Sequence, residues 1–85
     1  MIYQEPPKYP LDAKHAGITG MVWIKALVDK EGKVRQAIVG TSSGYASLDA
    51  AAVAAAYHNR YIPGYQNGRP VALWIKYKVD FRLNE

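Results

Sequence analysis

The sequence has no cysteine in its 85 residues, so neither a disulfide framework nor a thiolate metal site can support the fold. It has no run of about 18 apolar residues, and we therefore expect no part of it to span a membrane. Acidic residues are the minority, 7 against 11 Lys and Arg, and the net charge of +4 favours acidic partners. These absences indicate a small, basic domain whose core depends on packing alone.

Motifs of enzymes are also missing. His15 and His58 stand far apart and lack the His-x-x-x-His or Glu-x-x-His spacing of a metal site, so we interpret them as surface or capping residues. No serine lies in a nucleophile-elbow context, and no glycine-rich loop leads from a strand into a helix to hold a phosphate. We predict neither enzyme activity nor a cofactor.

The composition that is present is globular, 49% hydrophobic and 21% charged, in a length that suits one domain with one small core. The first residues differ from the rest, because Pro6, Pro7 and Pro10 disfavour a helix and favour an extended chain. We predict that residues 1–10 are the end of a Pro-containing linker that continues upstream. Residues 11–85 are expected to form the domain.

Apolar periodicity predicts five elements. The residues of 20–29 and of 70–83 alternate with a period of two, which indicates strands, and an Ala-rich stretch is the best helix former. The expected order is a short helix over 11–17, a strand over 20–29, a turn at 29–33, a strand over 34–42, a helix over 48–60 and a strand over 70–83. Val34 and Ala37 differ in parity, so burial of both predicts a bulge near Arg35–Gln36.

The Ala-rich helix has a recognisable beginning. Ser47 is expected to be its N-cap, and Asp49 lies in the first turn, where a carboxylate favours the helix dipole. Its apolar residues are small, so the helix can lie close to a sheet. The stripe expected to be buried, at helical spacing, is Leu48, Ala51, Ala52 and Ala55.

Together the elements predict an α+β fold. Strands of a hairpin are neighbours, and a helical crossover of this length returns the third strand antiparallel to the first, on its free side. The expected three-stranded antiparallel sheet has the order second, first, third, with both helices packed on one face. The long C-terminal strand therefore lies at an edge of the sheet.

This edge strand is unusually open for a protein of this size. Residues 71–83 contain no proline or glycine, although proteins normally shorten, bend or cover long sheet edges. Lys76 and Lys78 on its water-facing side favour an acidic segment, weakly and in a salt-dependent way. Because its backbone groups are left unpaired, we predict that another chain pairs with it, by strand addition or by dimerisation.

Alternative interpretations remain open at this point. Trp23 and Trp74 fall on the outer faces of adjacent strands, and either form an exposed patch or are covered by the linker or the short helix. A basic α+β domain with exposed aromatics also fits RNA binding, but the Lys/Arg-Gly-aromatic signature is missing, so we expect no nucleic acid. A homodimer in which two edges pair is a further alternative.

Short motifs follow one another along most of the chain. They are Tyr9-Pro10, Gly20-x-Val22, Asp29-x-x-Gly32-x-Val34, Ser42-Ser43-Gly44, Leu48-Asp49-x-Ala51-Ala52, Arg60-Tyr61-x-Pro63-Gly64, Asn67-Gly68-x-Pro70-Val71 and Val79-x-Phe81-x-Leu83. Each motif alone is weak. The ordered set, with its turn and strand spacings, resembles the C-terminal domain of TonB-family energy transducers from about Tyr9 to Leu83.

The resemblance implies a place and a task. In that family the domain lies in the periplasm, at the end of a Pro-rich spacer that leads to one inner-membrane helix and the proton-driven ExbB–ExbD motor. It pairs its last strand with the TonB box of outer-membrane transporters and passes on a pull that opens their plug, for uptake of siderophores, haem or cobalamin-type nutrients. A homodimer is compatible with this task.

The resemblance also assigns residues. Those implied to bind the partner are Lys8, Tyr9, Val71, Leu73, Trp74, Ile75, Lys76, Tyr77, Lys78, Val79 and Phe81. Some members carry a Gln just upstream of the Tyr-Pro pair that contacts the box. Here Gln4-Glu5-Pro6-Pro7-Lys8 has proline in that place, so contact by Gln4 stays open.

Overall fold

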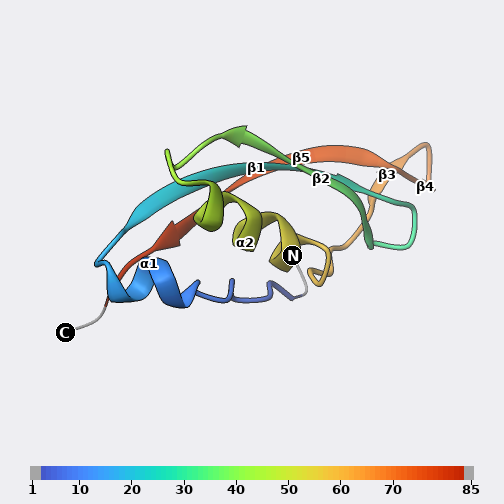
Figure 1. Ribbon diagram of the computed structural model, residues 1–85. Coiled ribbons are helices and arrows are strands. Elements are labelled where there is room, and N and C mark those ends of the chain that lie inside the picture. The colour runs from blue at the N-terminus through green and yellow to red at the C-terminus, as the bar shows by residue number, and fades with distance from the viewer. Residues whose placement is uncertain (1–2, 84–85) are drawn as a thin grey trace.

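The computed structural model describes residues 3–83, which form a sheet with helices on one side (Figure 1). In chain order the elements are α1 Leu11–His15, β1 Gly20–Val28, β2 Val34–Thr41, α2 Ala46–Ala56, β3 Gly64–Gln66, β4 Arg69–Val71 and β5 Leu73–Phe81. Residues 1, 2, 84 and 85 of the expected ranges 1–10 and 11–85 lie outside the described residues. The boundary between linker and domain stays a prediction.

The main sheet confirms the predicted α+β topology. Its order is β2-β1-β5, antiparallel throughout, and both helices lie on the same face (Figure 1). On that face Val22, Ile24, Ala26 and Val28 of β1 are buried, and they form the centre of the core. The molecule is elongated, 50 × 21 × 16 Å along its principal axes.

Helix α2 packs on this core through small side chains. Leu48 and Ala52 are buried as predicted, and the third buried residue is Ala56. Ala55, predicted for that place, is only half-buried, because the buried contact follows the i, i+4, i+8 row of the helix. Ala51 is half-buried and packs beside the row.

The beginning of α2 differs from the prediction. Ser47 lies inside the helix and is not its N-cap, and Tyr45 at the N-cap makes no side-chain capping bond. Asp49 lies in the first turn as expected, and its Oδ1 accepts hydrogen bonds from Ser43 N (3.0 Å) and Oγ (2.8 Å), while Ser42 Oγ donates to Oδ2. Burial opposes ionisation of Asp49, but these bonds together lower its pKa. The carboxylate therefore fastens the preceding loop to the helix.

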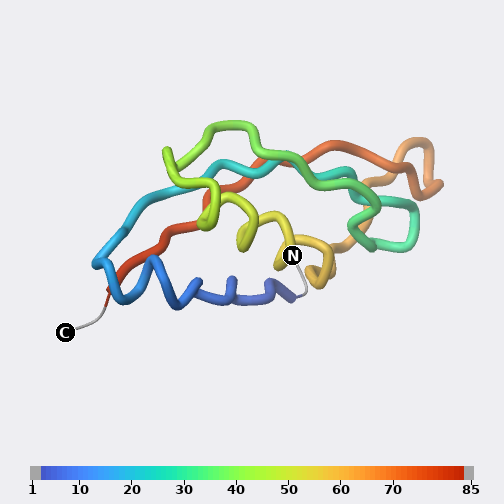
Figure 2. The backbone as a smooth tube through the Cα atoms, viewed as in Figure 1, coloured from blue at the N-terminus to red at the C-terminus, as the bar shows by residue number. Residues whose placement is uncertain are grey.

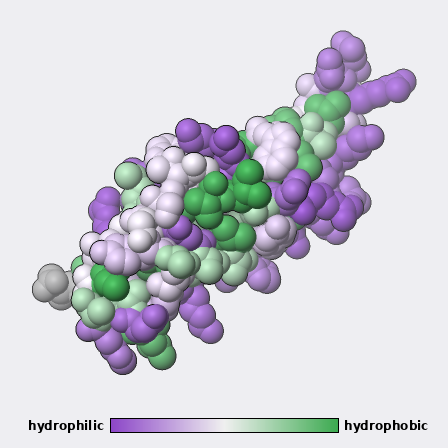
Figure 3. Space-filling model, turned by 45° about the horizontal axis from the view of Figure 1, so that its top comes forward, coloured by the Kyte–Doolittle hydropathy of each residue, from purple (hydrophilic) through white to green (hydrophobic). Residues whose placement is uncertain are grey.

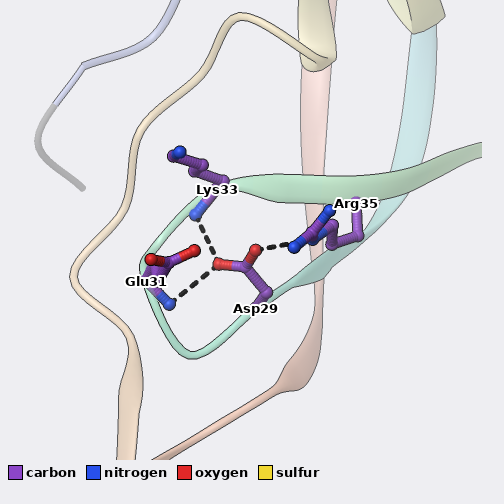
Figure 4. Close-up of polar contacts among 4 residues, drawn as sticks. All are labelled: Asp29, Glu31, Lys33 and Arg35. Atoms are coloured by element: carbon purple, nitrogen blue, oxygen red, sulfur yellow. Dashed lines mark hydrogen bonds and ion pairs between the residues drawn. The ribbon is translucent and has the colours of Figure 1, made fainter.

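The turn between β1 and β2 is built around Asp29 (Figure 4). Its Oδ1 accepts hydrogen bonds from the backbone N–H of Glu31 (2.8 Å) and Lys33 (2.9 Å), and its Oδ2 accepts one from Arg35 Nε (2.8 Å). Gly32 has a φ of 84°, and a Cβ there would lie 2.0 Å from a backbone carbonyl oxygen of the segment after α2. The turn therefore requires glycine for both its conformation and its close approach.

Strand β2 contains the predicted bulge. Leu27 pairs with Gln36 and Val28 with Val34, which leaves Arg35 without a partner on β1. Val34 and Ala37 are both buried, which is the condition on which the prediction rested.

A second register shift in β2 was not predicted. Trp23 pairs with Thr41 and Ile24 with Val39, so Gly40 is extra between them. Val39 is 37% exposed, which shows that the core does not extend along the whole of β2.

The predicted strand over 70–83 is divided. Strand β4 pairs with β3 around Asn67-Gly68 (φ 53° and 77°), and Ala72 separates β4 from β5. Two central residues with positive φ make the two-residue hairpin turn that Asn-Gly favours. The expectation of one continuous strand is wrong because this hairpin takes Val71 out of the edge strand, and Leu83 lies beyond its end.

The N-terminal segment lies along α2 and is bonded to the residues that follow that helix (Figure 2). Tyr3 and Arg60 exchange backbone hydrogen bonds of 3.0 and 2.8 Å, and Glu5 N–H donates to Asn59 Oδ1 at 2.7 Å. Asn59 is buried, and the chain leaves the helical path before it. This explains why α2 ends at Ala56, four residues short of the predicted end.

Candidate functional site

Strand β5 is open along one flank. On its other flank it pairs with β1 residue by residue, from Leu73 opposite Val28 to Phe81 opposite Gly20, without a register shift. Among residues 3–83 no strand pairs with the open flank. The predicted edge position of the last strand is thus confirmed, and its length is nine residues.

Two hydrogen bonds fix the direction in which the backbone groups of the sheet point. Ala37 N–H donates to Tyr57 Oη at 3.1 Å, away from β1, and Ala37 pairs with Ala26. In antiparallel pairs the N–H and C=O of one residue point to the same side, and successive residues alternate. The groups of Ala26 therefore point toward β5. The bond from Asp29 N–H to Lys33 O (2.8 Å) agrees, because Asp29, three residues after Ala26, should point its N–H to the β2 side by the same alternation.

This alternation also shows which backbone groups of β5 point to its open flank. Ile75 pairs with Ala26, so its N–H and C=O point toward β1, as do those of every second residue of the strand. The backbone groups that point outward belong to the alternate set, which is Trp74, Lys76, Lys78 and Asp80. An added strand would hydrogen-bond to these residues.

Burial changes along β5. Val79 and Phe81 are buried in the core, where the ring of Tyr9 packs on Phe81, whereas Ile75 is half-buried and Trp74 is 51% exposed. The end of the strand near the β3–β4 hairpin therefore presents both backbone and side chains to solvent.

A buried polar cluster holds β5 to the rest of the fold. Asn59 Nδ2 donates to Tyr61 Oη and to Tyr77 Oη, both at 3.1 Å. Burial raises the pKa of Tyr77 to about 12, with a smaller contribution from Tyr61, so the Tyr77 phenol is neutral at physiological pH. Because Asn59 also binds the backbone of Glu5, the cluster connects the N-terminal segment to the edge strand.

The outer face of the sheet, opposite the helices, is basic and aromatic. Trp23 is half-buried under Lys76, whose Nζ lies 5.0 Å from the ring centroid. Lys78 Nζ lies 3.8 Å from Asp80, which also faces Arg82 at 3.6 Å. Helix α1 and the N-terminal segment are on the opposite face (Figure 1), so neither covers the two tryptophans.

Comparison with known proteins identifies the family. A family model described as Gram-negative bacterial TonB protein C-terminal matches residues 5–83. The chain belongs to the TonB C-terminal family. The resemblance predicted from the ordered motifs is thereby confirmed. TonB-family proteins are energy transducers, and their C-terminal domain is periplasmic.

Relatives of this TonB domain are longer proteins. Protein TonB of Xanthomonas campestris pv. campestris is 38% identical over 79 residues, which are 93% of this chain and 35% of the relative. Protein tonB2 of Pseudomonas aeruginosa is 30% identical over 83 residues, which are 98% of this chain and 31% of the relative. The chain thus spans about a third of the length of these curated relatives.

The fold is shared with a solved TonB structure. The solution NMR structure of the Pseudomonas aeruginosa TonB CTD matches with a TM-score of 0.82, at 24% sequence identity. The match covers 99% of this chain and 85% of that chain. It supports the three-stranded order and the position of both helices.

The residues predicted to bind a partner fall into separate places in this TonB domain. Strand β5 carries Leu73, Trp74, Ile75, Lys76, Tyr77, Lys78, Val79 and Phe81. Val71 belongs to β4, and Lys8 lies beside α2. Tyr9 packs edge-to-face on Phe81, with ring centroids 5.4 Å apart, and donates a hydrogen bond to Ile18 O. Contact of any of them with a partner stays a prediction.

Two residues at the site were not singled out in the sequence. Asp80 directs its backbone to the open flank, and the period of two already grouped it with Lys76 and Lys78. Lys25 of β1 pairs with Lys76 on the outer face, and its parity in β1 placed it there. Pairing between strands, which the sequence does not give, was needed to bring them together.

Within residues 3–83 no group of three or more His, Asp or Glu side chains is arranged to hold a metal ion. In the same part of the chain, no helix has both the length and the apolar character that crossing a bilayer requires.

Proposed function

We propose that this domain is the periplasmic receptor-binding domain of a TonB-type transducer, and that β5 pairs with the TonB box of outer-membrane transporters. The observation that supports the proposal is the open flank of β5, where Trp74, Lys76, Lys78 and Asp80 direct their N–H and C=O groups outward. Strand addition uses such groups for affinity and leaves side chains on both faces for selectivity.

Backbone pairing suits a domain that transmits a pull. Each hydrogen bond contributes only about 0.5–1.5 kcal/mol net, so a pair of strands sharing a load along their length can hold and still separate. Because the backbone makes the contact, one domain can serve receptors of different sequence. The uninterrupted register of β5 with β1 passes the load into the centre of the sheet.

The proposal extends to the whole protein. A spacer upstream of the Pro-containing segment would lead to an inner-membrane anchor and to ExbB and ExbD, which supply energy from the proton gradient. The pull would enter through the N-terminal segment, which is bonded at Tyr3 to Arg60 and at Glu5 to Asn59. The energy would open transporters for siderophores, haem or cobalamin-type nutrients.

The test is a titration of the isotope-labelled domain with a peptide that contains a TonB box. We expect the largest amide shifts at Trp74, Lys76, Lys78 and Asp80. Lys78→Pro removes one outward donor and should weaken binding, whereas Lys78→Ala, which removes only the side chain, is the matched control. Shifts confined to other elements, or equal binding by both variants, would contradict the proposal.

A homodimer is a second candidate, favoured by the same open flank. Two copies could pair their β5 strands across a twofold axis, without a peptide. In that case the outward amides shift with protein concentration alone, and a peptide competes with the dimer. The two roles are separable because, in the absence of peptide, only dimerisation makes the β5 amide shifts depend on protein concentration.

A further inference from the structure

The outer face of the sheet carries a hollow of about 430 Å³ beside the open flank, lined by Lys25, Ile38, Trp74, Ile75 and Lys76. It spans all three strands of the sheet. Ile38 is 46% and Trp74 51% exposed, so apolar surface borders two ammonium groups. Figure 3 shows hydrophobic surface in the middle of the molecule, bordered by hydrophilic side chains. We call this feature the lysine hollow.

The charge of the lysine hollow is not neutralised within the described part of the chain. Lys25 and Lys76 are directly opposite each other on β1 and β5, an arrangement that is unfavourable for like charges. Neither forms an ion pair among residues 3–83, whereas Lys78 and Arg82 share Asp80. An anion placed between the two lysines would relieve this repulsion.

We propose that the lysine hollow receives the carboxylate of an acidic residue on the strand that pairs with β5. The inference rests on the proposed function and adds a determinant of specificity to it. Lys76 directs its backbone outward, so the residue of the added strand that pairs with it lies beside it on the outer face. Lys25 and Lys76 then select for Glu or Asp at that position.

The reach of the side chains allows this contact. Neighbouring strands lie about 4.8 Å apart, so an added strand would be about 10 Å from β1. A Glu side chain and the side chain of Lys25 can cover that distance between them. Lys76 already crosses the sheet, because its Nζ lies over the ring of Trp23 on β1, so both ammonium groups flank the same space.

An acidic peptide fits the hollow better than two other occupants. A second copy facing it would bring two further lysines against Lys25 and Lys76, which is electrostatically unfavourable. A single-stranded nucleic acid stacks its successive bases on several free aromatic faces, whereas here the ring of Trp23 is covered by Lys76 and only Trp74 of the two tryptophans is exposed. Charge complementarity and the neighbouring open flank both favour a peptide carboxylate.

The experiment uses short strand-forming peptides that carry a single Glu, moved along the peptide one position at a time, and matched peptides with Gln. Affinity and amide shifts are measured on the labelled domain at low and high salt. At the position that pairs with Lys76, Glu should bind about twofold to fivefold tighter than Gln, the range of exposed ion pairs, and less so at high salt. At the other parity, on the inner face, the preference should be absent.

Variants of the domain test which lysine causes the preference for Glu over Gln. Lys25→Gln should abolish most of it while the β5 amide shifts persist, because Lys25 lies one strand away from the pairing edge. Lys14→Gln on α1 makes the same change of charge and should retain the preference. A full preference in Lys25→Gln, or equal affinity for all Glu and Gln peptides, overturns the inference and leaves strand addition intact.

Two further outcomes are decisive. If no peptide shifts the β5 amides, the proposed function fails and this inference fails with it. If oligothymidine shifts Lys25 and Trp74 and displaces the Glu peptide, the hollow is a nucleic-acid site and the inference is wrong.

Discussion

The two edges of the sheet are built differently. Strand β2 shifts register against β1 twice, at Arg35 and at Gly40, and the outward N–H of Ala37 is bonded to Tyr57 Oη. Strand β5 keeps one register with β1 over nine residues, and its outward N–H groups have no partner among the hydrogen bonds of residues 3–83. One edge is irregular and capped, and the other is regular and open.

The difference indicates which edge is available to a partner. Bulges and capped donors are common means by which proteins prevent unwanted pairing at sheet edges. Their presence on β2 alone leaves β5 as the edge where an extended segment can be added in register. Selectivity between the edges thus comes from the domain's own bulges and its Tyr57 cap, before any side chain of the partner is considered.

The largest expected effect comes from proline on β5, and it depends on parity. Ile75→Pro removes an N–H that points to β1 and leaves an acceptor of Ala26 unpaired, so the free energy of unfolding should fall by about 3 kcal/mol. Lys76→Pro removes an N–H that points outward and should cost much less stability. Urea unfolding of the two neighbouring variants, followed by tryptophan fluorescence, measures the difference.

Binding should show the reverse order of effects. Lys76→Pro is expected to lose peptide affinity while folded, and Lys76→Ala controls for the lost side chain. Hydrogen exchange in the unmodified domain gives an independent check, since Ile75, Tyr77 and Val79 should exchange slowly and Lys76 rapidly. Equal destabilisation by both prolines would mean that the backbone directions inferred from the Ala37–Tyr57 hydrogen bond are wrong.

Strand faces and sheet order could be predicted from the sequence, whereas backbone direction could not. A period of two gives the face of each side chain, and the parity change between Val34 and Ala37 gave the bulge at Arg35. The period does not say to which flank of the strand an N–H points, because a residue on either face of the sheet can point its N–H to either flank. That information came from the bond between Ala37 and Tyr57, residues 20 apart in the sequence.

The ends of elements were the other part that the sequence left uncertain. The Asn67-Gly68 turn made a hairpin of its own because β3 was present to pair with β4, and a three-residue strand has too little pattern to be recognised. The end of α2 was set by burial of Asn59, a long-range contact with Glu5 and Tyr77. In the candidate site, proximity of Lys25 to Lys76 likewise required the strand register.

Removing the cap on Ala37 N–H at the β2 edge should lower the stability of the domain moderately. Tyr57→Phe removes the acceptor of Ala37 N–H, and because Tyr57 is 43% exposed, water can replace it in part, so we expect a loss of at most about 1 kcal/mol. The Ala37 amide should exchange faster, measured by NMR, while the outward amides of β5 do not change. Peptide binding should stay on β5, because the bulges of β2 remain. New peptide-induced shifts on β2 would show that the cap, and not the bulges, keeps this edge closed.

The smallest expected effect concerns the turn that leads into the irregular edge. The Lys33 backbone N–H above all, with the Glu31 N–H and Arg35, holds the pKa of Asp29 below its usual value of 3.8, against the opposing effect of desolvation. A folded-state pKa below the unfolded one stabilises the fold above pH 3.8, and this contribution is lost as the pH falls through the folded pKa. Asp29→Asn should therefore be less stable than the unmodified domain at neutral pH, and the difference should shrink below about pH 4. Urea unfolding as a function of pH measures it.

Arg35→Gln separates the two sources of that stabilisation. Because the Lys33 N–H is the main cause of the lowered pKa of Asp29 and a backbone donor survives the substitution, Arg35→Gln should keep most of the pH dependence. If it removed the dependence as completely as Asp29→Asn, the guanidinium at the bulge would be the dominant partner. The turn into the irregular edge would then depend on the Arg35 side chain, as the cap on Ala37 N–H depends on Tyr57, and only the bulges would remain as a backbone difference from β5.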